Sequence, residues 1–159
     1  MGFERKAALV GMIISIFFIS EAQAVDLSGR LGIGLNYPGV SLKCGVGPKV
    51  AIEAKGQLEE DITIYGSRLY YNFNRGKAMN LFLGGEADYV TFEGEDSKGS
   101  GFAVEAFIGG EYFLMKNLSL TTDIGPAYVS LKDDDTEETE EGVEYVVNVG
   151  VNLYFGGGK

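Results

Sequence analysis

The chain has 159 residues, with 23 Asp and Glu against 13 Lys and Arg, no His, no Trp and a single cysteine, Cys44. The formal net charge of −10 argues against a nucleic-acid partner, because phosphate binding needs clustered Lys and Arg. One cysteine also excludes a framework of internal disulfides.

The N-terminal residues have the pattern of a secretory signal peptide. A basic start at Arg5 and Lys6 precedes a short apolar run, and the small-x-small sequence AQA follows at 22–24. The apolar run is too short for a stable bilayer-spanning anchor. We therefore predict a signal peptide over 1–24, cleaved after its last residue, and one mature domain over 25–159. An uncleaved anchor helix is the alternative.

After the signal, apolar and polar residues alternate with a period of two, in runs separated by turn signals. This pattern predicts an all-β domain. We expect eight strands, at 28–36, 40–45, 48–57, 61–74, 78–92, 101–115, 118–131 and 142–155. One bent strand over 30–45 would give seven, a number that closes less naturally into a barrel.

The connections between the predicted strands differ in length and charge. In an up-and-down barrel the first, third, fifth and seventh connections share one end. The two longest and most acidic connections, EGEDSKGSG and KDDDTEETEEG, both belong to this group. Short turns at one end and longer loops at the other are typical of outer-membrane barrels. A soluble meander gives no reason for such sorting.

Each long strand has one apolar face and one face that carries the charges, as in VEYVVNVGVNLYF over 143–155. In a soluble barrel the apolar face points inward, and in a membrane barrel it points outward. Phe residues and many Gly share the charged face, which makes it a poor water-facing surface. It fits a packed polar lumen better, because an eight-stranded barrel is just wide enough for side chains to fill it.

The charged face supplies the candidate lumen network. Its predicted members are Lys43, Glu53, Lys55, Arg68, Glu86, Glu105, Glu111 and Asp123. One interpretation is a salt-bridged plug, since buried charges are tolerated when they are paired. The other is a polar or ion-conducting path, or a paired-carboxylate site. We favour the plug, and because acids outnumber bases we expect some carboxylates to be protonated or hydrated.

Aromatic residues on the apolar face collect near the strand ends. Toward the long-loop end the predicted girdle contains Tyr89, Phe102, Tyr128 and Tyr145. Toward the short-turn end it contains Tyr71, Phe73, Tyr112 and Phe155. Two aromatic girdles that flank an aliphatic band match the two interfaces of a membrane. Cys44 falls on the same apolar face and is interpreted as a small hydrophobic residue.

The loop KDDDTEETEEG is densely acidic and partly resembles a calcium loop, although Glu138 occupies the sixth position, where glycine is required. The favoured interpretation is a solvated, mobile loop. The alternative is weak binding of divalent cations, or a cation bridge to lipopolysaccharide phosphates. The candidate residues for this alternative are Asp133, Asp134, Asp135, Glu137 and Glu138. We predict no dedicated metal site.

Taken together, these patterns resemble the small eight-stranded outer-membrane barrels of the OmpA/OmpX type. The most specific part is the last strand, where apolar residues alternate back from Phe155 to Val147. In that family, alternation back from a C-terminal aromatic is the signal read by the barrel-assembly machinery, although here 156–159 follow the aromatic. The resemblance implies an antiparallel up-and-down transmembrane barrel in the bacterial outer membrane, monomeric and in contact with lipid and lipopolysaccharide.

No catalytic group is predicted, and no cofactor. What is known of outer-membrane barrel enzymes implies a His in the usual catalytic groups, and this chain has none. The expected function is a structural or surface-interaction role in the envelope, with the acidic external loops as the contact surface. Two alternatives stay open: a soluble periplasmic barrel that binds a small apolar ligand, and a narrow channel.

Overall fold

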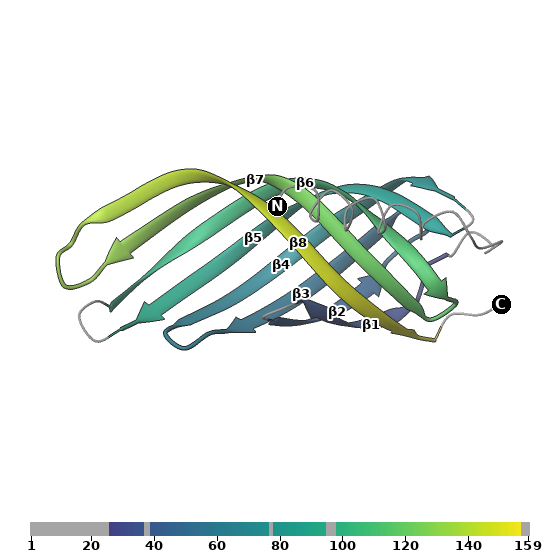
Figure 1. The fold of residues 1–159 in the computed structure, drawn as a ribbon, viewed down its shortest axis with the longest axis horizontal. Coiled ribbons are helices and arrows are strands. Elements are labelled where there is room, and N and C mark those ends of the chain that lie inside the picture. Colours follow the sequence, from purple (N-terminus) through teal and green to yellow (C-terminus); the bar gives the residue numbers. More distant parts are fainter. Residues whose placement is uncertain (1–25, 37–38, 77, 95–97, 157–159) are drawn as a thin grey trace, which may run out of the picture.

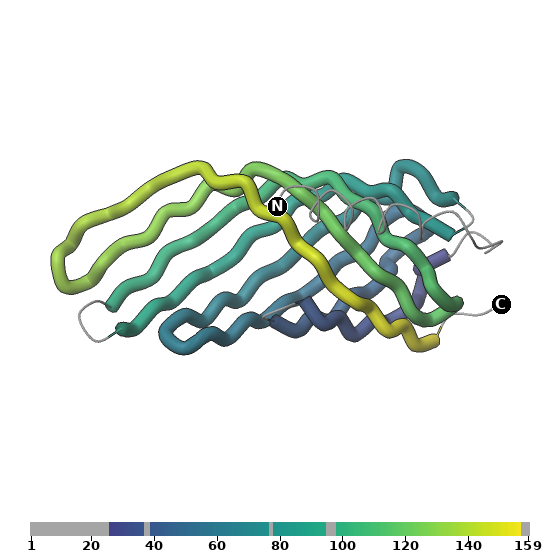
Figure 2. Tube along the Cα trace, in the orientation of Figure 1, coloured from purple at the N-terminus to yellow at the C-terminus, as the bar shows by residue number. Residues whose placement is uncertain are grey.

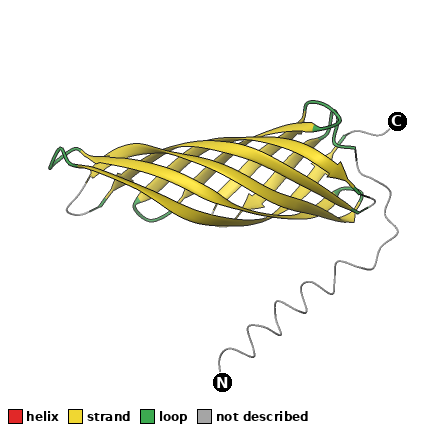
Figure 3. Cartoon of the chain, turned by 90° about the horizontal axis from the view of Figure 1, so that it is seen from above, coloured by secondary structure: helices red, strands yellow, loops and turns green. Residues whose placement is uncertain are grey.

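The computed structural model describes residues 26–36, 39–76, 78–94 and 98–156, so the signal peptide predicted over 1–24 lies outside the described residues. None of the described residues belongs to a helix long and apolar enough to cross a membrane. The described chain is built from strands joined by short loops (Figure 3). The strands are β1 (Leu31–Asn36), β2 (Gly39–Gly45), β3 (Val50–Leu58), β4 (Ile62–Arg75), β5 (Met79–Glu93), β6 (Lys98–Met115), β7 (Leu118–Asp133) and β8 (Thr139–Phe155).

The strands form a closed barrel in which each one pairs antiparallel with the next (Figure 1). Closure is made by β1 and β8, whose paired residues run from Leu31 opposite Phe155 to Asn36 opposite Gly150. The expectation of an eight-stranded, antiparallel, up-and-down barrel is confirmed.

Strand length increases around the barrel, from 6 residues in β1 and 7 in β2 to 18 in β6 and 17 in β8. Figure 2 shows the β5–β6 and β7–β8 hairpins reaching far beyond the β1–β2 hairpin at the same end. The two long acidic loops expected from the sequence are therefore mostly strand. Thr139 already pairs with Lys132, and Lys98 with Glu93. The polar residues of these hairpins continue the backbone hydrogen-bond ladder beyond the barrel wall. The sequence analysis had assigned them to loops.

Burial alternates along the strands, with polar residues inside and apolar residues outside. In β7 the side chains of Ser119, Thr121 and Asp123 are buried, whereas Leu120 and Ile124 are exposed. This polarity is the reverse of that of a soluble barrel, in which apolar side chains fill the interior.

A small aromatic core occupies the interior, formed by Tyr70, Phe82 and Phe107 packed with Ala51. Tyr70 and Phe82 meet edge to face, with ring centroids 5.1 Å apart. Gly84 makes room for this packing, because a Cβ at that position would collide with the Phe107 ring. Charged side chains contact this core, with Lys43 over the Tyr70 ring and Arg68 over the Phe107 ring.

Candidate functional site: the charged lumen and the distal hairpins

Arg68 organises the first lumen network. Its guanidinium lies 2.6 Å from a Glu86 carboxylate oxygen and 2.7 Å from Oδ1 of Asp123. Lys55 forms ion pairs with the same Glu86 and with Asp88, the latter at 3.2 Å. The Arg68 guanidinium also stacks over the Phe107 ring, 4.1 Å from its centroid. Two cations are thus shared among three carboxylates contributed by strands β5 and β7.

Glu111 organises the second network and is completely buried. Its carboxylate pairs with Lys43 Nζ at 3.1 Å and accepts hydrogen bonds from Ser119, Asn152 and Tyr154 at 2.6, 3.1 and 2.5 Å. Four donors on one buried carboxylate offset its desolvation. Lys43 in turn lies over the Tyr70 ring, 4.1 Å from its centroid, which joins this network to the aromatic core.

Two further carboxylates are held by neutral donors. Glu53 accepts a hydrogen bond from the Tyr70 hydroxyl at 2.6 Å and one from the Asn36 amide at 3.2 Å. Glu105 accepts from the Asn148 amide at 3.4 Å, and the same amide donates to Asp123 at 2.9 Å. Within the described ranges, Glu105 has no cation at ion-pair distance.

All eight predicted lumen residues line the interior, seven of them buried and Lys55 half-buried. They form the two networks above rather than a single site. The prediction omitted Asp88, Tyr70, Asn148, Asn152 and Tyr154. Each of these shares the inward parity of its strand, so the alternation that identified the charged residues could also have identified them.

Most of the predicted girdle residues are exposed on the outer face. The end of the barrel with the β3–β4, β5–β6 and β7–β8 turns is called the distal end. There Tyr65, Tyr89 and Phe102 lie side by side on neighbouring strands, and Phe102 contacts Tyr128 with ring centroids 6.1 Å apart. Tyr65 was not among the predicted members. The structure also differs at Tyr112, which is only 6% exposed. Tyr112 has the same parity along β6 as the exposed Ile108 and Leu114, so neighbouring groups cover its side chain without a reversal of its direction.

The acidic run at the β7–β8 turn folds into a compact turn. Asp133 accepts hydrogen bonds from the backbone amides of Asp135 and Thr136 at 2.8 and 3.0 Å. The Thr136 and Asp135 amides hold the pKa of the Asp133 carboxyl below its usual range, because they stabilise the charged form. Glu137 adopts a positive φ of 59° in this turn.

Across the described residues no group of three or more His, Cys, Asp or Glu is arranged to hold a metal ion. Weak cation binding by the loop acids stays a prediction.

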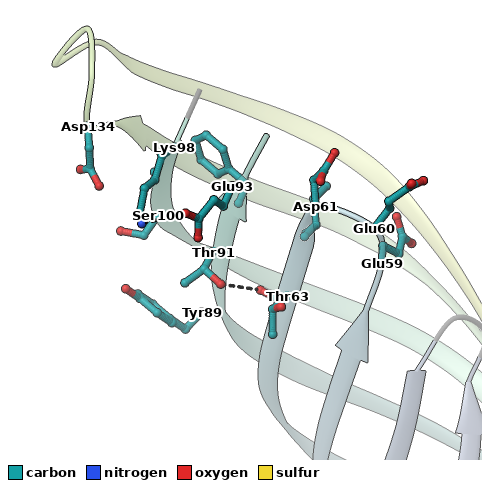
Figure 4. A pocket seen from close by; sticks show the side chains of 13 residues that line it. Glu59, Glu60, Asp61, Thr63, Tyr89, Thr91, Glu93, Lys98, Ser100 and Asp134 are labelled. Carbon is teal, nitrogen blue, oxygen red and sulfur yellow. Dashed lines mark hydrogen bonds and ion pairs between the residues drawn. The ribbon is translucent and has the colours of Figure 1, made fainter. Parts of the chain in front are cut away.

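An open depression of about 650 Å³ lies beside the distal ends of β4, β5 and β6. Its carboxylates come from Glu59, Glu60, Asp61, Glu93 and Asp134, and its cation is Lys98, which pairs with Glu93 at 3.1 Å (Figure 4). This end of the molecule therefore presents an acidic surface.

No family model matches this sequence, and no curated protein matches it. Among solved structures, the chain is similar to the N-terminal β-barrel domain of Pseudomonas aeruginosa OprF, with a TM-score of 0.52 and 14% sequence identity. The match covers 79% of this chain and 94% of that domain. The chain therefore has the OmpA-like eight-stranded barrel fold that its sequence pattern resembles.

Proposed function

We propose that this protein spans the bacterial outer membrane and serves the envelope in a structural or surface-interaction role. The observation that carries the proposal is the inverted polarity of the barrel. Aliphatic and aromatic side chains cover its outside, whereas Lys43, Arg68 and Glu111 are buried within it. An outer surface of this kind suits lipid, and a soluble monomer rarely exposes so extensive an apolar surface.

The filled interior supports a closed barrel over the two alternatives. A soluble barrel that binds an apolar ligand needs an apolar interior, but here ion pairs and hydrogen bonds occupy that space. A channel needs an open path, but Tyr70, Phe82 and Phe107 pack across the lumen between the two networks. We infer that the protein is not an enzyme and that its distal hairpins carry the interaction.

The proposed partners follow from the outer surface and the last strand. Lipid and lipopolysaccharide would cover the aliphatic band and its aromatic rows, around a monomeric barrel. The apolar residues of β8 that face outward, ending at Phe155, would present the signal to the barrel-assembly machinery. The acidic β7–β8 turn would lie outside the cell.

Labelling of intact cells tests the orientation. In a Cys44→Ala background, Asp135→Cys places a thiol at the β7–β8 turn, and Asn117→Cys places one at the β6–β7 turn of the opposite end. A membrane-impermeant maleimide should label Asp135→Cys on intact cells and Asn117→Cys only after permeabilisation. Equal labelling of both variants, or recovery of the protein in the soluble periplasmic extract, would overturn the proposal.

A further inference from the structure

Strand β8 has a free edge over much of its length. β7 pairs with β8 from Thr139 to Leu153, but β1 pairs with it only from Gly150 to Phe155. In the part of the chain that the structure describes, no strand lies on the other side of 139–149. At about 3.3 Å per residue this edge is roughly 35 Å long. Figure 1 shows β8 leaving β1 and continuing with β7 to the distal hairpin.

The backbone groups that face this edge can be assigned from the register. The Tyr154 amide donates to the Asn117 carbonyl at 2.7 Å, so even-numbered residues of β8 direct their amides toward β7. The β7–β8 register has no shift, so this parity holds along the ladder. In an antiparallel strand the alternate residues point the other way. The amides and carbonyls of Val143, Tyr145, Val147 and Val149 therefore face the free edge.

The side chains of the same residues are exposed and have cross-strand neighbours only on β7 among the described residues. Val143, Tyr145, Val147 and Val149 are 68%, 80%, 61% and 65% exposed. Val151, where β1 is alongside, is only 38% exposed. A long apolar edge with unpaired backbone groups is a template for another strand, and unpaired groups cost still more beside lipid.

Charge determines which strand fits this edge. Its distal part carries Glu140, Glu141 and Glu144, all exposed. If a second copy of this chain paired here with the distal parts side by side, these acids would lie opposite the same acids, which is unfavourable. A segment with basic residues would complement them.

We propose that the free edge of β8 binds an extended segment of a partner protein by strand addition, and that this segment alternates basic with apolar residues. Main-chain hydrogen bonds would supply affinity, and the apolar side chains would cover Val143 to Val149. The inference deepens the surface-interaction role proposed above and rests on it.

The test uses the full mature chain in detergent micelles and a fluorescein-labelled peptide of alternating Lys and Val, with fluorescence anisotropy as the readout. The control peptide has the same composition with its Lys and Val in separate blocks. Val147→Pro removes an amide that faces the free edge and leaves the β7 ladder intact, since edge strands tolerate proline there. Val147→Thr keeps that amide and serves as the matched control.

We expect the alternating peptide to bind the wild type and Val147→Thr equally, and Val147→Pro about tenfold or more weakly. The blocked peptide should bind more weakly than the alternating one. Val143→Pro, further out on the hairpin, repeats the test if Val147→Pro does not fold. Equal affinity for the proline and threonine variants, or no binding at about 1 mM peptide, would overturn the proposal. A dimer that Val147→Pro abolishes would overturn it too, by assigning the edge to a second copy.

A heat-dependent gel shift, recorded for every variant, separates this outcome from failure of the proposed function. If the wild type and Val147→Thr show the heat-dependent shift but do not bind the alternating peptide, the strand-addition site alone is contradicted.

Discussion

Glu111 is the residue whose loss the lumen should tolerate least. Replacing it with Ala leaves Lys43 buried without its ion pair and removes the acceptor for Ser119, Asn152 and Tyr154. Breaking a buried pair in this way costs about 3–5 kcal/mol of folding free energy. Urea unfolding of the micelle-bound barrel, followed by circular dichroism, measures the difference.

Glu105→Gln is the matched control within the same lumen. Glu105 is buried but has only the Asn148 amide as its hydrogen-bond partner among the described residues. Removing its charge should leave the free energy of unfolding unchanged or raise it, since no cation loses a partner. Equal destabilisation by Glu111→Ala and Glu105→Gln would contradict the assignment of the two networks.

The stability of the β7–β8 turn should depend on pH because of Asp133. Its pKa is lowered in the folded turn by the Thr136 and Asp135 amides, so the stabilisation is present above the ordinary carboxyl pKa. It should be lost as the pH falls through the lower, folded pKa. The protection factor of the Thr136 amide, from hydrogen exchange measured by NMR against pH, should fall at that point, and Asp133→Asn should reduce the dependence. If protection of the Thr136 amide does not change with pH, the Asp133 carboxylate does not stabilise the turn.

At the scale of the strand, the outer face of β6 distinguishes lipid from water. Ile108 is exposed in mid-strand, opposite the equally outward Ile124. Ile108→Lys should cost about 2–4 kcal/mol if the residue faces the bilayer midplane. On a soluble protein the same change would fall within about 0.5 kcal/mol. Equilibrium unfolding from lipid vesicles measures the cost.

Leu58→Lys, at the end of β3 next to the β3–β4 turn, is the control for the strand comparison. It is exposed like Ile108, but in a membrane-spanning barrel it would lie near the interface, where a basic residue costs about 0–1 kcal/mol. If Ile108→Lys is no more destabilising than Leu58→Lys, the outer face of β6 does not lie against a hydrocarbon core.

Period-two alternation was enough to predict the number of strands, their faces and the inward position of Arg68 or Glu111. It could not predict where pairing stops, because polar hairpins such as 132–139 form the same ladder as the barrel wall. It also could not predict the register shift in β6, between Phe113 and Met115. Both features depend on hydrogen bonding between strands, which leaves little trace in residue type.

At the scale of the complete barrel, closure determines which charged lumen residues form ion pairs with one another. Lys43 meets Glu111 and Arg68 meets Asp123 across 68 and 55 residues of chain. Those pairings follow from the strand stagger and tilt around the barrel, which a list of inward residues does not contain. The sequence therefore identified eight of the charged lumen residues, but not Asp88 and not the two-network arrangement.

Because side chains fill the lumen, we predict that the barrel does not conduct ions. Tyr70, Phe82 and Phe107 pack together between the ion-pair networks, so a reconstituted barrel should show no steady single-channel conductance in a planar bilayer. Phe82→Ala combined with Phe107→Ala should open a path and give measurable conductance. A wild-type barrel that conducts steadily would favour the narrow-channel alternative.

Whether the apolar face of the barrel lies against lipid can be tested on a single gel. The envelope fraction is extracted with mild detergent and run in SDS both unheated and boiled. A closed membrane barrel resists SDS until it is heated, so we expect two mobilities, with the unheated form distinct from the boiled one. Recovery of the protein in the soluble periplasmic extract, with a single mobility under both conditions, would contradict the account.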